Sequence, residues 1–409
     1  MNTINPTIST TSMAPELVTD QPLVERSDLV TKITVFLTLA VIFLVPFGDG
    51  IWDGLPRVSA ILAISFSLIL FLLHGTHRNY NFFHFFSVLY IAWQLISLIW
   101  TPDFEWGKGM AITTGQLLLL ALMVTLVLDS KKKIIYAYQA YVLGNLVGSG
   151  IIVSNYLQGI QSPYYNRYGI QNIETDTLSI FLALSIPMAA YLATKHQSKF
   201  LKIINMMAIP IVFYAIFLTG TRTGSIVGVL GLLYWLYTHR KASITIKSGI
   251  SIVLVLSIIA IFSFSPKASV DRIFSSGKSI SSGTLNYRTV IWAGSLNQWR
   301  KSPIIGTGIG GLGFALSREH IDFRDAHNTF IHNIAEFGVI GLLLYLSMIL
   351  TILFYILRTP TDEKAFMLTL LMVVVVSQLT THTHTEKIIW IVFSLLAIHS
   401  SRFSLEMNS

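Results

Sequence analysis

Long apolar stretches separated by short polar connections run along most of this 409-residue chain. A helix needs roughly 20 largely apolar residues to cross a bilayer, and about twelve stretches approach that length. They lie near residues 31–47, 58–73, 83–100, 110–128, 134–154, 177–194, 201–219, 224–238, 248–264, 331–357, 365–381 and 387–401. The pattern predicts an all-α fold, a polytopic integral membrane bundle of about twelve transmembrane helices.

The composition also indicates a membrane protein. Charged residues make up 12% of the chain, whereas they are about 25% of a typical soluble domain. The absence of cysteine excludes disulfides and thiolate metal sites. Residues 1–30 are rich in Ser, Thr and Pro and lack hydrophobic periodicity, so we expect a disordered cytoplasmic tail there.

The positions of lysine and arginine predict the orientation. If the N-terminus is cytoplasmic, fifteen of the 28 basic residues fall in cytoplasmic segments and only five in short outer loops. This excess follows the positive-inside rule, so both termini are expected in the cytoplasm. Spans one to nine then occupy 31–264, a long outer loop 265–330, spans ten to twelve 331–401, and a cytoplasmic C-terminus 402–409.

The remaining basic residues are concentrated in the outer segment 265–330. They are Lys267, Arg272, Lys278, Arg288, Arg300, Lys301, Arg318 and Arg324. One interpretation is a solvated loop, and the other is a surface that binds an anionic substrate. The net charge of +8 comes mainly from this segment and the positive-inside excess, and it does not indicate a nucleic-acid partner.

The predicted spans contain few groups that could carry a coupling ion. Ion-driven transporters usually place carboxylates at mid-membrane depth, and no Asp or Glu lies in the middle of any span. The polar exceptions are Gln94, Gln116, Asn145, Asn205 and Gln378, which we interpret as interhelical hydrogen-bonding residues. The chemistry is therefore expected in the outer segments.

Four outer stretches combine charge with Gly, Asn or His. They are residues 165–169, residues 219–224, residues 286–292, and His327-Asn328 with the downstream Gly338 and Gly341. Each comes from a different part of the chain but from the same predicted side of the membrane. A site shared by all four is geometrically feasible.

The order of these motifs resembles the O-antigen ligase and O-antigen polymerase superfamily. The matching residues are Thr-Arg-Thr-Gly at 221–224, Arg288 followed by Trp292, Lys-Ser-Pro-Ile-Ile-Gly-Thr-Gly at 301–308, and His327-Asn328 with Gly338 and Gly341. The spacing of the last group, nine residues and then two, is that of the ligase branch. The motifs cover about residues 165–345, and the twelve-span layout extends the resemblance to the whole chain.

The resemblance implies a membrane-embedded glycosyltransferase of the GT-C type at the periplasmic face of a bacterial inner membrane. It implies a donor glycan on undecaprenyl diphosphate within the membrane lipid, and a sugar hydroxyl of lipid A-core as acceptor. No cofactor is expected. Two alternatives stay open: a polymerase that joins undecaprenyl-linked repeat units, and a lipid-linked oligosaccharide flippase or exporter, which would need basic residues deep in the spans.

Three residues are the candidates for catalysis. Arg222 and Arg288 suit a diphosphate, because a guanidinium offers paired donors and remains charged. His327 suits a general base or acceptor-orienting group, because imidazole titrates near neutral pH. The plainer interpretations are a headgroup contact for Arg222, a surface charge for Arg288 and a structural role for His327.

Weaker candidates surround these three. We expect substrate contacts from Arg167, Tyr287, Trp292 and Asn328, with a simple loop cation as the alternative for Arg167. On a helix, Glu336 would lie near His332, and capping the helix start is its expected role.

A histidine pair near the C-terminus raises the question of a metal. His382 and His384 with Glu386 have the residue types of a metal site but fall in a short turn. We expect no metal ligands and a metal-independent transfer, because arginines can neutralise a diphosphate in place of an ion.

Overall fold

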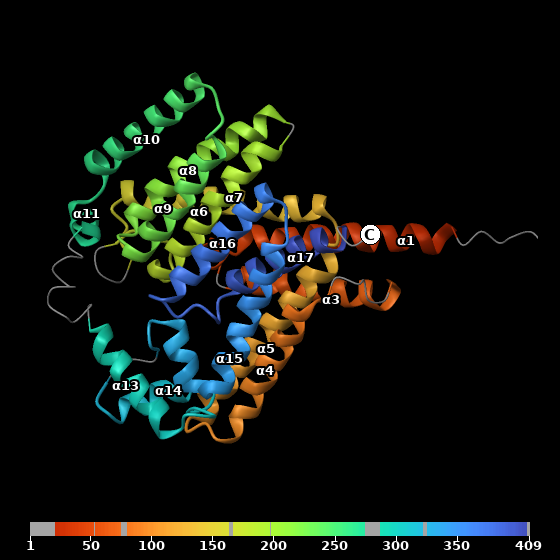
Figure 1. The fold of residues 1–409 in the computed structure, drawn as a ribbon, viewed down its shortest axis with the longest axis vertical. Helices are drawn as coiled ribbons and strands as arrows, with labels where there is room; N and C mark the ends of the chain where they lie inside the picture. The colour runs from red at the N-terminus through yellow and green to blue at the C-terminus, as the bar shows by residue number, and fades with distance from the viewer. Residues whose placement is uncertain are drawn as a thin grey trace, which may run out of the picture.

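The structure is a computed structural model that describes residues 21–52, 54–74, 80–162, 167–196, 198–274, 287–321 and 325–406. Within these residues all regular structure is helical (Figure 1). The helices are α1 (Gln21–Leu44), α2 (Gly48–Ile51), α3 (Leu55–His74), α4 (Phe82–Ile96), η1 (Ser97–Ile99), α5 (Phe104–Val127), α6 (Lys131–Leu157), α7 (Thr175–Lys195), α8 (Lys199–Leu218), α9 (Arg222–Thr238), α10 (Ile244–Phe264), α11 (Lys267–Phe274), α13 (Arg288–Lys301), α14 (Gly311–Ser317), α15 (Thr329–Leu357), α16 (Thr361–Gln378) and α17 (Lys387–Glu406).

The helices explain the apolar pattern of the sequence. Each of the twelve predicted apolar stretches falls on one of them. Among the described residues, eight helices are long and apolar enough to cross a membrane, and the apolar parts of α1 and α17 are shorter. The protein is therefore a polytopic helical membrane protein. Helix α1 begins at Gln21, inside the segment predicted to be a tail, and the tail residues 1–20 lie outside the described residues.

Helix α7 is the centre of the bundle. It packs against α6, α8, α9 and α16, and 89% of its most apolar 18-residue stretch is buried. A helix that is apolar all round is stable only when other helices surround it. Helix α10, in contrast, is only 11% buried and lies along one edge beside α8 (Figure 1).

Polar residues inside the spans join neighbouring helices. The Asn205 amide on α8 donates to Gln139 Oε1 on α6 at 2.8 Å. The Gln378 amide on α16 donates to the Tyr345 hydroxyl on α15 at 2.5 Å. The predicted interhelical role is confirmed for Asn205 and Gln378, whereas the Asn145 amide bonds to Tyr141 in its own helix.

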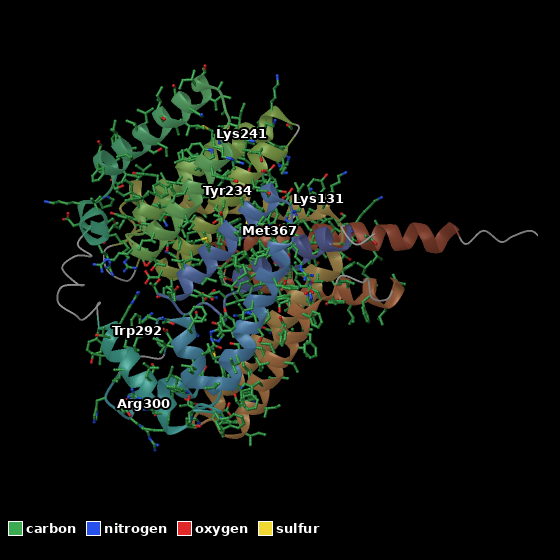
Figure 2. All side chains as sticks on the ribbon, in the orientation of Figure 1. Lys131, Tyr234, Lys241, Trp292, Arg300 and Met367 are labelled. Atoms are coloured by element: carbon green, nitrogen blue, oxygen red, sulfur yellow. The ribbon has the colours of Figure 1, made fainter. Side chains whose placement is uncertain are left out.

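The segment predicted as a long outer loop contains three helices, α11, α13 and α14. Helices α13 and α14 form a small apolar core with the start of α15. Its buried residues are Ile291, Leu312, Leu316, Ile321, Ala326 and Ala335. Figure 1 shows α11 and α13 on the side of the molecule opposite to the N-terminal end of α1. In Figure 2, Trp292 and Arg300 on α13 lie far from Lys131 and Lys241, two of the predicted cytoplasmic cations.

Candidate active site

Three arginines from separate parts of the chain share one electrostatic environment. Arg167 precedes α7, Arg222 begins α9 and Arg288 begins α13. Burial lowers the pKa of Arg288, the charges of Arg222 and Arg167 lower it further, and the carboxylates of Asp176 and Asp325 oppose both effects. A guanidinium stays charged under such a shift. The structure thus concentrates positive charge beside two carboxylates at one end of the bundle.

Arg167 is held by Asp176 at the start of α7. The Arg167 side chain is buried, and its Nη1 donates to Asp176 Oδ1 at 2.7 Å and to Thr175 Oγ1 at 2.8 Å. The Thr221 hydroxyl, one residue before α9, lies 3.4 Å from the same Asp176 oxygen. Asp176 therefore links the Arg167 segment to the turn that carries Arg222.

Arg222 is fixed to the outer segment as well. Its Nε donates to the carbonyl oxygen of Arg272 on α11 at 2.9 Å. The turn before Arg222 contains Gly220, whose φ of +61° lies in the left-handed region that favours glycine.

His327 pairs with a carboxylate two residues before it. The backbone N–H of His327 donates to Asp325 Oδ1 at 2.7 Å, and the ring Nδ1 lies 3.4 Å from the same oxygen. The backbone turns sharply here, since His327 has a φ of 45°. Trp292 on α13 holds this turn by donating to the Ala326 carbonyl at 2.8 Å. An imidazole oriented by a carboxylate is a suitable general base.

Asp325 joins the His327 turn to the buried histidines behind it. Burial by itself raises the pKa of Asp325, but the neighbouring His382 and His327 hold it below the usual value. On the other side, burial raises the pKa of Glu174, and the charges of Asp176 and Asp325 add to this rise. Acidic and basic groups therefore lie close enough at the site to influence one another.

Asn328 uses its side-chain amide to hold the start of α15. Its Oδ1 accepts from the N–H groups of Phe330 and Ile331, and its Nδ2 donates to the Leu379 carbonyl at 2.9 Å. The expectation that Glu336 caps this helix is wrong, because Asn328 is the cap and Glu336 bonds to His332 one turn further on. Asn328 thus positions His327 through the backbone.

A kink in α15 explains the motif glycine at 338. Gly338 has φ +67° and ψ −169°, a conformation essentially restricted to glycine. Its Cα lies against the backbone of Ile304 and Ile305, and the freed N–H of Val339 donates to Pro303 at 3.0 Å. The 301–308 motif is therefore packed into the kink, and it fixes the direction of the helix start that carries His327.

The other predicted contacts lie at the edge of the site. Tyr287 has left-handed backbone angles directly before α13, and its side chain is exposed. The indole N–H of Trp292 already donates to the Ala326 carbonyl. Predicted motif residues 165, 166 and 286, and the cations Lys278 and Arg324, lie outside the described residues.

One group of side chains could hold a metal ion among the residues that the structure describes. It consists of His332, His382 and His384. Burial lowers the pKa of His382 and of His384 well below the usual value. Glu386, which the sequence suggested as a partner, instead lines a separate 270 Å³ pocket with Asp49 and Glu174.

The fold and this site define a helical membrane protein with an arginine-rich polar centre at one end of its bundle. Residues 207–346 match the family model described as O-antigen ligase. The match includes Arg222, Arg288 and His327, and it confirms the predicted resemblance to the O-antigen ligase and O-antigen polymerase superfamily.

One relative with a similar sequence comes from Haemophilus influenzae. This uncharacterised protein is 24% identical over 252 residues, which cover 56% of the present chain and 60% of the relative. The chain thus aligns with less than two thirds of that relative's length.

Proposed function

We propose that this protein transfers a glycan from undecaprenyl diphosphate to a sugar hydroxyl of lipid A-core at the periplasmic face of the inner membrane. The observation that carries the proposal is the gathering of Arg167, Arg222 and Arg288 beside the His327–Asp325 pair. Paired cations suit a diphosphate, and an imidazole beside a carboxylate suits activation of a hydroxyl. Both features lie largely within the family match.

The proposed reaction is a direct displacement at the anomeric carbon. The acceptor oxygen attacks as the bond from that carbon to the diphosphate oxygen breaks, and the electron pair leaves with the diphosphate. His327 takes the hydroxyl proton at Nε2, because its Nδ1 faces Asp325. Arg222 and Arg288 stabilise the negative charge that grows on the leaving group. Attack from the face opposite the diphosphate inverts the anomeric configuration, and the arginines make Mg²⁺ unnecessary.

An apolar groove supports a polyprenyl-linked donor. It has a volume of about 440 Å³ and lies between α8, α9 and α10, lined by residues such as Phe213, Trp235 and Ile258. Helix α9 begins at Arg222 and α10 leads into α11, to which Arg222 is bonded. A lipid tail in this groove would bring its diphosphate close to Arg222.

The test is transfer by the purified protein in lipid nanodiscs that contain the lipid-linked donor and lipid A-core. We expect Arg222→Ala, Arg288→Ala and His327→Ala each to lower the rate by about 10²- to 10⁴-fold. The matched control is Arg300→Ala, because Arg300 is exposed on the same helix α13 and, among the described residues, donates to the nearby Asn297 side chain. Equal rates for Arg300→Ala and Arg288→Ala would refute the assignment.

The same assay separates the alternatives. A polymerase would extend a second undecaprenyl-linked glycan and ignore lipid A-core. A flippase would move the donor across the bilayer without forming a glycosidic bond. In cells, loss of a ligase leaves long chains on the carrier lipid, whereas loss of a polymerase leaves single units on the core.

A further inference from the structure

Three histidine rings from two separate elements meet behind the His327 turn. His332 lies in the first turn of α15, while His382 and His384 lie in the connection between α16 and α17. The ring centroids of His332 and His382 are 3.8 Å apart, and those of His382 and His384 are 4.5 Å apart. One ring nitrogen from each histidine lies within 4.8 Å of the other two.

Four of the six ring nitrogens of this histidine cluster have no hydrogen-bond partner among the described residues. His332 Nδ1, His382 Nε2 and both ring nitrogens of His384 are buried and unpaired. His332 and His384 are only 3% and 1% exposed, so water does not replace the missing partners at the surface. Buried polar atoms are nearly always paired, and one nitrogen from each of three buried rings meeting within 4.8 Å points to an electrophilic partner between them.

A carboxylate holds the cluster from behind. Glu336 Oε2 lies 2.9 Å from His332 Nε2, so the unpaired Nδ1 is the His332 atom that remains for the cluster. Glu336 is itself fixed by the N–H of Leu312 at 3.3 Å. A histidine that binds a metal through one ring nitrogen usually donates from the other nitrogen to a carboxylate. This hydrogen bond fixes the ring and raises its basicity.

We propose that His332, His382 and His384 form a binding site for a divalent transition metal ion, with Zn²⁺ as the best match. Neutral imidazoles suit Zn²⁺ and other transition metals, whereas Mg²⁺ and Ca²⁺ prefer oxygen ligands. At a Zn–N distance of roughly 2.0–2.1 Å, tetrahedral ligand nitrogens lie about 3.3 Å apart. The present separations are up to 4.8 Å, and the His332 and His382 rings are stacked at an angle of 26°, so the rings would rotate to close the site.

The surrounding charges and walls fit a buried cation. Glu336 bonds to His332, and Asp325 interacts electrostatically with His382 and His332, so two carboxylates offset the double positive charge. Tyr90, Phe337 and Tyr345 pack around His384 at centroid distances of 6.2 to 6.4 Å. Such an apolar shell limits access of water to the ion.

The ion would have a positioning role. It would join the start of α15 to the α16–α17 connection directly behind Asp325, and so brace the turn that carries His327. It would not contact the diphosphate, so the site is compatible with a transfer that needs no Mg²⁺. The expectation of no metal ligands considered His382 and His384 with Glu386, whereas the structure supplies His332 from α15 as the third histidine.

The test is the metal content of the purified protein, carrying an affinity tag without histidine and held in nanodiscs. After incubation with Zn²⁺ and removal of unbound ion, elemental analysis should give about one Zn²⁺ per chain, as expected for a three-histidine site. His382→Ala and His384→Ala should reduce this at least tenfold. The control His320→Ala, an exposed histidine in the outer segment, should retain full binding.

A second measurement covers variants that fail to fold. Wild-type protein loaded with Co²⁺ should show the visible absorption of tetrahedral cobalt, and Zn²⁺ should abolish it. Wild-type protein without bound Zn²⁺, binding that is unchanged in His384→Ala, or octahedral cobalt spectra would each overturn the proposal. Neither measurement uses a glycan substrate, so a failure here is distinct from a failure of the proposed transfer.

Discussion

Replacing Gly338 by Ala tests whether the kink in α15 is required for the site. Gly338 has φ +67° and ψ −169°, and an added Cβ would lie 2.5 Å from the backbone nitrogen of Ile305 and closer still to the Ile304 carbonyl. A residue with a side chain cannot adopt these backbone angles without strain. The atoms nearest to the added Cβ belong to the backbone, so they cannot move away by a side-chain rotation. The Gly338→Ala chain must therefore either straighten the helix or displace the 301–308 motif.

The expected cost follows from these contacts. A non-glycine residue in this conformation costs about 1–3 kcal/mol. Displacement of the motif also weakens backbone bonds such as Val339 N–H to Pro303 at 3.0 Å and Gly308 N–H to Glu336 at 2.8 Å, each worth about 0.5–1.5 kcal/mol. We expect Gly338→Ala to destabilise the protein by roughly 3 kcal/mol or more.

The assay is thermal unfolding in detergent, followed by tryptophan fluorescence at one fixed heating rate. The matched control is Gly150→Ala, because Gly150 lies in the regular helix α6 and an added Cβ there would meet nothing within 4 Å. That change should be neutral or stabilise by about 0.5–1 kcal/mol. If both variants melt at the same temperature, the kink does not contribute as described.

Two further changes test the polar contacts. Asp176→Asn should destabilise the protein by about 2 kcal/mol, because it removes the carboxylate that pairs with buried Arg167. The control Asp362→Asn removes an exposed carboxylate 4.0 Å from Arg240 and should change the melting temperature little. Equal changes in melting temperature for the two variants would contradict this prediction. Burial, with the charges of Glu174 and Asp49, raises the pKa of Glu386 to about 7. The protonated Glu386 carboxyl contributes to stability in full below its unfolded pKa of about 4.5, and this contribution is lost as pH rises through about 7. The melting temperature of Glu386→Gln should therefore rise relative to that of the wild type as pH increases from about 5 to 8. A difference in melting temperature that stays the same at every pH would exclude the shift in pKa.

The catalytic candidates show what a motif can and cannot predict. Arg222, Arg288 and His327 were predicted from local sequence order, and the structure places them at one end of the bundle. Their roles remain predictions. Asp325 was not predicted as the partner of His327, although an aspartate two residues before a turn residue commonly accepts its backbone N–H. That local signal could have identified it.

Other parts of the site had no local signal. The Arg167–Asp176 pair was hidden because neither residue stands in a strict motif, and the pairing depends on how the 167–174 segment folds onto α7. Residues 265–330 were predicted as a long outer loop, and α11 and α14 within them were not predicted. Helix α13 has little apolar periodicity, so its packing on α14 and α15 is what stabilises it.

The sequence by itself determined that this chain is a helical membrane protein, because a backbone in lipid must satisfy its own hydrogen bonds and long apolar stretches can do so only as helices. The distribution of its cations also predicted which end carries the chemistry. Only the tertiary structure decided that His332 joins His382 and His384, residues about fifty positions apart. Such contacts depend on which helices pack together and at what depth, and no local pattern encodes that choice.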